Sequence, residues 1–206
     1  MTISWLPTRR PSREFMYRRV RRFLRGKRFE TALDLACGVM RMAPYISAER
    51  YIGLDLNEES LRRGMQRGRH RSAVVSTIED MPADLGGDLV LCLQTIGINR
   101  RASVELTMTH VERMIAATRA GGCLVANVGP LSSAYFAPIE QELRRAFDRV
   151  ESIEYGRFRS KSVFPNFLLK IWLMERRPAA AADPLHPMRL FIAEGRRPDQ
   201  PPSQAA

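Results

Sequence analysis

Two short apolar runs near the start of the chain each contain a carboxylate at or near their end. They are Leu33–Ala36 and Tyr51–Leu56, and their acids are Asp34 and Asp55. A small-residue turn at Ala36–Gly38 and a segment long enough for a short helix separate them, which predicts a strand, crossover and strand unit. The second acid follows the first by about 20 residues, the spacing at which an acid ending the second strand meets a ribose. A nucleoside is therefore the first ligand to consider.

The same alternation of apolar runs and helical patterns continues along the chain. Asn57 can cap a helix whose first turn holds Glu58 and Glu59, where the helix dipole favours acids. The pattern predicts further strands over 72–78, 88–94 and 123–128, and helices over 103–120 and 138–147.

The last two runs predicted as strands are Arg149–Tyr155 and Phe167–Glu175. The loop between them is too short for a crossover helix, so we expect them to pair antiparallel. From Arg177 onward the chain is rich in Pro and Ala, which predicts a mostly disordered tail. Within that tail Leu190–Ile192 could dock against the domain.

These patterns divide the chain into a leading segment, 1–28, a domain, 29–176, and a tail, 177–206. The leading segment carries ten Lys or Arg against one acid, whereas the whole chain has a net charge of +11. Its apolar residues recur at helical spacing, which predicts a basic amphipathic helix. Such a helix either covers the edge of the domain or, through residues 9–28, binds an anionic lipid, glycan or nucleic acid. The residues of the apolar stripe are Met16, Val20, Phe23 and Leu24.

Composition narrows the protein class. A chain of 206 residues with 45% hydrophobic content can bury one core, so we expect a single domain with appendages. No apolar run approaches a membrane span, and arginines interrupt the apolar N-terminal residues, so we expect a cytoplasmic protein. Cys37, Cys92 and Cys123 lie far apart, which argues against a zinc site or disulfides, and we expect no metal.

The glycines of the first turn distinguish between nucleoside cofactors. Dinucleotide sites need several glycines there, because the backbone presses against a pyrophosphate. This turn has only Gly38. A cofactor without phosphates, such as S-adenosylmethionine, needs fewer glycines in this turn. At these residues the chain resembles the class I S-adenosylmethionine-dependent methyltransferases, whose first motif is an acid followed by alternating glycines. Asp34 and Gly38 match the motif, whereas Ala36 and Met40 stand where glycines are usual.

The resemblance covers roughly residues 13–176 and implies an α/β fold. The expected sheet is Rossmann-like and doubly wound, with seven strands: five parallel strands and a C-terminal antiparallel pair. It also implies in-line transfer of a methyl group from S-adenosylmethionine to a nucleophile, for which positioning matters more than a general base.

Cofactor contacts follow from the resemblance as hypotheses. Asp55 would accept both ribose hydroxyls, Gly38 and the neighbouring Ala36 would let the methionine moiety approach the backbone, and Asp34 would lie near its ammonium group. Leu56 and Ile78 would enclose the adenine.

In the family an acid that ends the third strand binds the adenine amine. Here Thr77 takes that place, so either Thr77 accepts the bond or Asp80 substitutes for the acid. At the far end of the fourth strand Cys92, Leu93 and Gln94 would line the cofactor.

Candidates for a catalytic side chain are poorly marked. They are Tyr17 on the leading helix, Gln94, and His110 on the helix before the fifth strand. The lack of an inserted recognition module suggests a small-molecule acceptor such as a metabolite, sugar or lipid, with 129–136 and 157–166 as a lid.

Two alternatives remain. One is an RNA or DNA methyltransferase that uses the Arg-rich helix, although the tetrapeptide typical of base amino-methylation is absent at Leu93–Ile96. The other is a non-catalytic binding protein on the same scaffold, which the missing glycines at Ala36 and Met40 and the replaced acid at Thr77 would favour.

Overall fold

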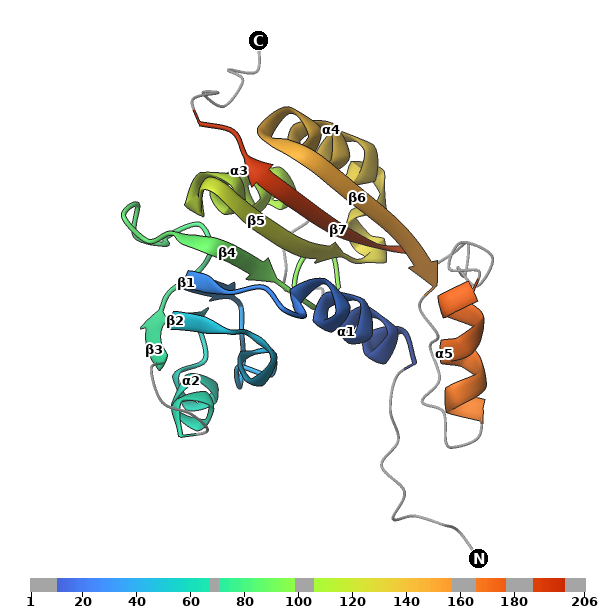
Figure 1. The fold of residues 1–206 in the computed structure, drawn as a ribbon, viewed down its shortest axis with the longest axis horizontal. Helices are drawn as coiled ribbons and strands as arrows, with labels where there is room; N and C mark the ends of the chain where they lie inside the picture. Colours follow the sequence, from blue (N-terminus) through green and yellow to red (C-terminus); the bar gives the residue numbers. More distant parts are fainter. Residues whose placement is uncertain (1–10, 67–70, 99–105, 157–165, 177–186, 199–206) are drawn as a thin grey trace, which may run out of the picture.

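A computed structural model of the chain describes residues 11–66, 71–98, 106–156, 166–176 and 187–198. Its centre is a seven-stranded sheet in the order β3-β2-β1-β4-β5-β7-β6 (Figure 1). Neighbouring strands from β3 to β5 pair in parallel, and β7 runs antiparallel to both β5 and β6. The predicted α/β fold, with five parallel strands and an antiparallel pair, is confirmed.

The strands are β1 (Phe29–Leu35), β2 (Ala48–Asp55), β3 (Arg71–Val75), β4 (Gly87–Cys92), β5 (Thr118–Val128), β6 (Phe147–Gly156) and β7 (Pro187–Arg196). The α-helices are α1 (Pro11–Leu24), α2 (Glu58–Met65), α3 (Thr107–Ala117), α4 (Phe136–Ala146) and α5 (Asn166–Arg176), and two short 3-10 helices are η1 (Ala43–Tyr45) and η2 (Pro130–Tyr135). The crossover from β1 to β2 therefore contains only η1 rather than a longer helix.

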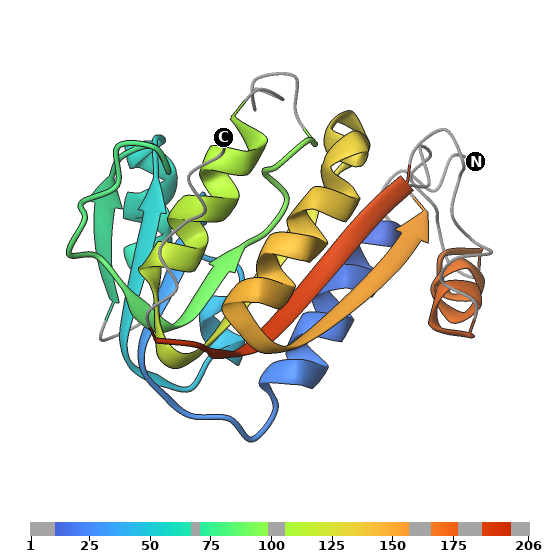
Figure 2. The same ribbon diagram turned by 90° about the horizontal axis from the view of Figure 1, so that it is seen from above.

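Helices cover both faces of the sheet (Figure 2). Alternate residues of each strand point to opposite faces, so that Ala32 of β1 belongs to one apolar cluster and Leu33 to the other. The first cluster packs under α1, α2 and α5, and the second under α3 and α4. This two-sided burial explains why the central strands read as nearly continuous apolar runs.

The leading helix α1 belongs to the domain core. Its residues Phe15, Met16 and Val20 are completely buried, and the Phe15 ring lies 5.3 Å from the Tyr155 ring of β6. Of the four side chains of the predicted stripe, Met16, Val20 and Leu24 are buried and Phe23 is only partly buried. The apolar side of the basic helix thus covers one face of the sheet.

Of the last two predicted strands, Arg149–Tyr155 is confirmed as part of β6, whereas the prediction for the other was wrong. Phe167–Glu175 lies in helix α5, and the partner of β6 is β7, which includes Leu190–Ile192. The expectation of a disordered tail is therefore also wrong for Pro187–Arg196. The parts of that tail at 177–186 and 199–206 lie outside the described residues. So does the predicted lid loop at 157–166, except for Asn166, which begins α5.

Local signals were more accurate. Asn57 caps α2, since its side-chain oxygen accepts a hydrogen bond from the Ser60 N–H at 2.9 Å.

Among the helices that the structure describes, none is long and apolar enough to cross a membrane.

Candidate cofactor-binding site

The turn after β1 has an unusual backbone conformation. Ala36, Gly38 and Met40 have φ angles of 52°, 53° and 54°. These are the three positions of the acid-and-glycine motif, and a left-handed conformation is costly for any residue except glycine. The turn is held by a hydrogen bond from the Cys37 N–H to the Leu54 carbonyl of β2 at 3.1 Å. The turn therefore has the conformation of a glycine-rich turn, although two of the three positions hold alanine and methionine.

The Met40 side chain is accommodated by glycines elsewhere. It is 1% exposed, and a β-carbon at Gly53 would lie 2.6 Å from its Cε atom. A β-carbon at Gly64 of α2 would lie 2.8 Å from its Cγ atom. Met40 thus fills space that Gly53 and Gly64 leave open between β2 and α2, which explains how a long side chain replaces a glycine here.

Asp55 ends β2 directly beside this turn. One of its carboxylate oxygens accepts the Gly38 N–H at 2.8 Å and the other accepts the Asn57 N–H at 2.9 Å. The side chain is partly exposed, and each oxygen has a second lone pair for a further donor. Leu56, which follows it, is 68% exposed. A carboxylate and an apolar side chain next to a close-approach turn fit the ribose and adenine of a nucleoside.

Asp34 is buried at the end of β1, with a relative exposure of 4%. Burial raises its pKa to about 7; the hydroxyl of Tyr51, which donates to it, lowers the pKa in part, and the nearby charge of Asp55 raises it further. Burial and the neighbouring Asp34 also raise the pKa of the Cys37 thiol. At neutral pH Asp34 is therefore only partly ionised. A nearby cation would favour its ionised form.

Thr77 and Asp80 lie in one turn after β3. The Thr77 hydroxyl donates to the Asp80 carboxylate at 2.9 Å and accepts the Asp80 N–H at 2.9 Å. The two candidates for the adenine amine are therefore adjacent, and Asp80 has the larger remaining acceptor capacity. Ile78 between them is buried in the core cluster under α3 and α4.

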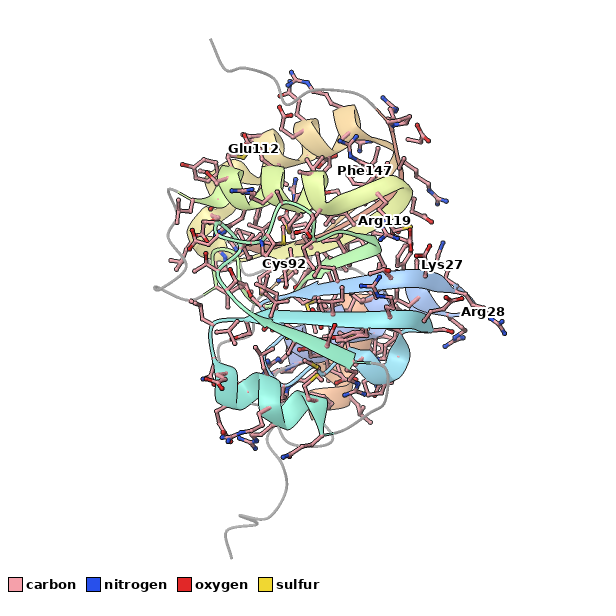
Figure 3. The ribbon with its side chains drawn as sticks, turned by 90° about the vertical axis from the view of Figure 1, so that its left-hand side faces the viewer. Lys27, Arg28, Cys92, Glu112, Arg119 and Phe147 are labelled. Atoms are coloured by element: carbon pink, nitrogen blue, oxygen red, sulfur yellow. The ribbon has the colours of Figure 1, made fainter. Side chains whose placement is uncertain are left out.

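The residues after β4 form a buried network. Gln94 has a φ angle of 66°, and its N–H donates to the Asn127 side-chain oxygen at 2.6 Å. Asn127, fully buried in β5, donates in turn to the Tyr155 hydroxyl at 3.3 Å. Cys92 is completely buried (Figure 3) and Leu93 nearly so. Sequence reasoning missed Asn127 and Tyr155, although an asparagine inside an apolar strand was a signal that it has a partner.

The structure places the three catalytic candidates in different surroundings. The Gln94 side-chain amide lies 3.5 Å from the Met16 sulfur of α1. Tyr17, also on α1, is partly buried against the same core cluster. His110 is buried in α3, with its Nε2 atom 2.8 Å from a Glu79 carboxylate oxygen. Burial raises the pKa of Glu79, but hydrogen bonds from its own N–H and from His110 outweigh this, so the pKa is lowered.

The part of the predicted lid that is described is anchored. Ser132 in η2 is buried, and its hydroxyl lies 2.8 Å from that of Thr107 at the start of α3. A β-carbon at Gly97, in the loop after β4, would lie 2.7 Å from the Ser132 oxygen. The loops after β4 and β5 are therefore tightly packed against each other.

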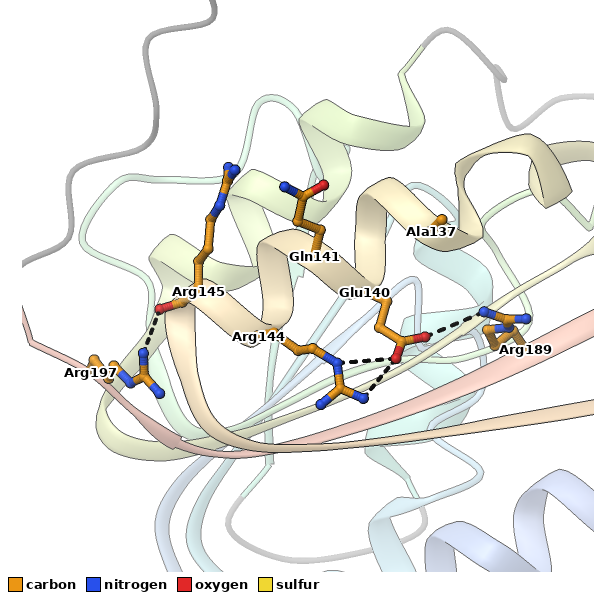
Figure 4. A pocket seen from close by; sticks show the side chains of 7 residues that line it. All are labelled: Ala137, Glu140, Gln141, Arg144, Arg145, Arg189 and Arg197. Atoms are coloured by element: carbon orange, nitrogen blue, oxygen red, sulfur yellow. Dashed lines mark hydrogen bonds and ion pairs between the residues drawn. The ribbon is translucent and has the colours of Figure 1, made fainter.

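A hollow over α4 and β7 is separate from this region (Figure 4). Four arginines line it, but each lies beside a carboxylate. Arg144 and Arg189 share Glu140, at 2.7 Å and 3.4 Å. Because these charges are compensated, the hollow is not a strong anion site. The other two pairs are Arg145 with Glu142 at 2.6 Å and Arg197 with Asp148 at 2.9 Å.

Comparison with known proteins gives a clear result for the fold. No protein-family model matches the chain, and no curated protein sequence matches it. Among solved structures, N-methyltransferase NodS from Bradyrhizobium japonicum WM9 in complex with S-adenosyl-L-homocysteine has a TM-score of 0.61 at 15% identity, over 93% of this chain and 90% of that one.

Two further structures show the range of similar proteins. Phospholethanolamine N-methyltransferase 2 from Haemonchus contortus has a TM-score of 0.59 at 15% identity, over 89% of this chain and 53% of that one. An rRNA methylase from Streptococcus thermophilus has a TM-score of 0.51 at 12% identity, over 91% and 98%. The chain therefore has the fold of the class I S-adenosylmethionine-dependent methyltransferases, and at these identities the likeness establishes the fold alone.

Proposed function

We propose that the protein is an S-adenosylmethionine-dependent methyltransferase that acts on a small-molecule acceptor. The observation that carries this proposal is the turn at Ala36, Gly38 and Met40, which keeps three left-handed residues at a cost in stability and bonds to Asp55. A turn without a binding role would have no reason to hold alanine and methionine in a left-handed conformation. The residues present therefore fit the cofactor.

The roles of the chain's residues follow from their positions. Asp55 would accept the two ribose hydroxyls through its remaining lone pairs, with Leu56 against the adenine. Asp80, with Thr77 behind it, would accept the adenine amine. Asp34 would lie near the methionine ammonium, whose positive charge would favour its ionised form.

The cofactor, when bound, supplies a methyl group that its sulfonium already activates. The chain has to align a nucleophile and exclude water. Gln94 is suited to such alignment, because its strained backbone is held by Asn127 and its side chain lies against α1 at the end of β4. Strain of this kind is commonly retained at functional sites.

A small acceptor is favoured over a nucleic acid by the pairing of the basic helix. Arg21 of α1 bonds to Glu14 at 2.7 Å, and Arg19 lies 3.6 Å from Glu175 of α5. Arg19 and Arg21 are partly buried in these pairs, so they have less charge to offer to a phosphate backbone than the exposed Arg18, Arg22 and Arg25. Among the similar structures, the methyltransferase from Haemonchus contortus is in complex with phosphomonomethylethanolamine, and the protein from Streptococcus thermophilus is an rRNA methylase.

Isothermal titration with S-adenosyl-L-homocysteine, with NAD as the control ligand, tests the proposal. We expect micromolar binding of the first and none of the second. Lack of binding by the folded protein to either ligand would overturn the proposal and favour a non-catalytic protein on this scaffold.

The same titration tests the ribose contact. In Asp55→Asn one oxygen becomes an amide donor, so that a hydrogen bond worth about 2 to 3 kcal/mol is lost. We expect affinity to fall roughly thirty- to a hundredfold. Asp148→Asn, an exposed acid on β6 paired with Arg197, is the matched control and should bind normally. Unchanged affinity in a folded Asp55→Asn protein would remove the ribose assignment.

A further inference from the structure

Helix α5 carries an exposed apolar face. Its inner side is formed by Ile171 and Met174, which are buried in the core cluster. Its outer side, the apolar face of α5, would normally be polar in a helix that packs on a domain. The side chains of this face, with their exposed fractions, are Leu168 (44%), Leu169 (54%), Trp172 (49%) and Leu173 (41%).

Arginines border this face. The guanidinium group of Arg176 lies 4.4 Å from the centre of the Trp172 ring. Helix α1 packs beside α5 (Figure 1), and its Arg22 lies 3.5 Å from Glu175 of α5. Arg18, Arg22 and Arg25 of the leading segment are exposed, and their spacing of four and three residues places them on one side of the helix. The exposed leucines and tryptophan thus lie next to a positively charged rim.

We propose that the apolar face of α5 and the exposed Arg18, Arg22 and Arg25 bind the surface of an anionic phospholipid bilayer. Leucine and tryptophan insert at the boundary between head groups and acyl chains, and arginines beside them attract lipid phosphates. The net charge of +11 is complementary to such a surface. An RNA would use the arginines but would leave the three leucines exposed, so a bilayer accounts for more of this surface.

The position of α5 in the fold supports this surface. In the sequence α5 follows β6 and precedes β7, and the pairing of these two strands ends at Gly156 opposite Pro187. At the same edge of the sheet Val128, which ends β5, pairs with Arg189. The parallel strands end there, and the turn after β1 lies at that edge too. Membrane binding would therefore bring the candidate site close to the bilayer, but it does not depend on methyl transfer.

Vesicle flotation tests the proposal with the full chain. Vesicles of phosphatidylcholine with and without phosphatidylglycerol are the probes, and we expect the protein to float with the anionic vesicles. The chain has two tryptophans, so that Trp5→Phe leaves Trp172 as the only one. In that variant the emission of Trp172 should shift to shorter wavelength when anionic vesicles are added, because the indole leaves water.

Paired variants separate the two contributions. Leu169→Glu/Leu173→Glu should lower vesicle partitioning about tenfold or more, because two inserted side chains become charged. The control is Val75→Glu, which changes an exposed residue of β3 at the other edge of the sheet and should leave partitioning unchanged.

The charge contribution is tested in the same way. Arg18→Gln/Arg25→Gln should lower partitioning about tenfold or more on anionic vesicles, with little change on neutral ones. Arg62→Gln/Arg63→Gln on α2 is the matched control for the same loss of charge and should bind like the unmodified protein.

Four outcomes would overturn the proposal. One is that the folded protein fails to float with anionic vesicles, and another is that Leu169→Glu/Leu173→Glu floats as well as the unmodified protein. The third is a dimer in sedimentation velocity that the same variant converts to a monomer, which would assign the face to a second copy. The fourth is salt-sensitive binding of RNA without binding of vesicles.

Discussion

The left-handed conformation of Ala36 leads to a direct prediction: Ala36→Gly should stabilise the protein. The φ angle of Ala36 is 52°, and the residue is partly exposed, so removal of its methyl group costs little packing. In most places the same replacement is destabilising, because glycine gains freedom in the unfolded chain and is a poor former of helices. Ala116, an exposed residue of α3, provides that comparison.

The magnitude follows from two opposing terms. A residue other than glycine pays about 1 to 2 kcal/mol in the left-handed region, which Ala36→Gly recovers. The greater freedom of glycine in the unfolded chain takes back about 0.4 to 1 kcal/mol. The net gain is about 0.5 to 1 kcal/mol, or roughly 2 to 4 °C in Tm at the upper end for a chain of this size. Ala116→Gly should instead lose about 0.5 to 1 kcal/mol.

Thermal and urea unfolding of the two variants, followed by circular dichroism, measure this difference. The opposite signs of the two changes exclude a general effect of adding a glycine. If Ala36→Gly lowered stability as much as Ala116→Gly does, the turn would not be strained at this position in solution, and the structural basis of the candidate site would be wrong.

Two further predictions concern neighbours of this turn. Gly53→Ala should destabilise the protein by about 1 to 3 kcal/mol, because its β-carbon would lie 2.6 Å from the Met40 Cε atom and 2.8 Å from the Cys37 Sγ atom. The loss should be smaller in a Met40→Ala background, where only the Cys37 contact remains, and additive losses in urea unfolding would contradict the Met40 contact. Asp34→Asn should change how stability depends on pH. The pKa of Asp34 is raised by burial from 3.8 to about 7, so its protonated form stabilises the fold at low pH, and that contribution is lost as pH rises through this range. Between about pH 5 and about pH 8 the unmodified protein should therefore lose about 3 kcal/mol relative to Asp34→Asn. Parallel pH dependence of the two proteins would show that Asp34 does not titrate in this way.

Much of the fold was predictable because its signals are local. The Asn57 cap depends on residues within one turn of helix, and the strands from β1 to β5 were visible as apolar runs followed by turn residues. The positions of Asp34, Gly38 and Asp55 followed from the spacing of two such runs. A strand that is buried on both faces reads as an apolar run, so it can be recognised without knowing which strands pair with it.

The sequence by itself thus determined which segments form the parallel strands and which residues lie at their carboxyl ends. Tertiary structure decided the rest. Phe167–Glu175 is an apolar run that either a strand or a helix could contain, and β7 is a strand because β5 and β6 provide hydrogen bonds on both of its sides. The left-handed conformation of Met40 likewise depends on Gly53 and Gly64, which are distant in sequence, because only their missing side chains make room for it.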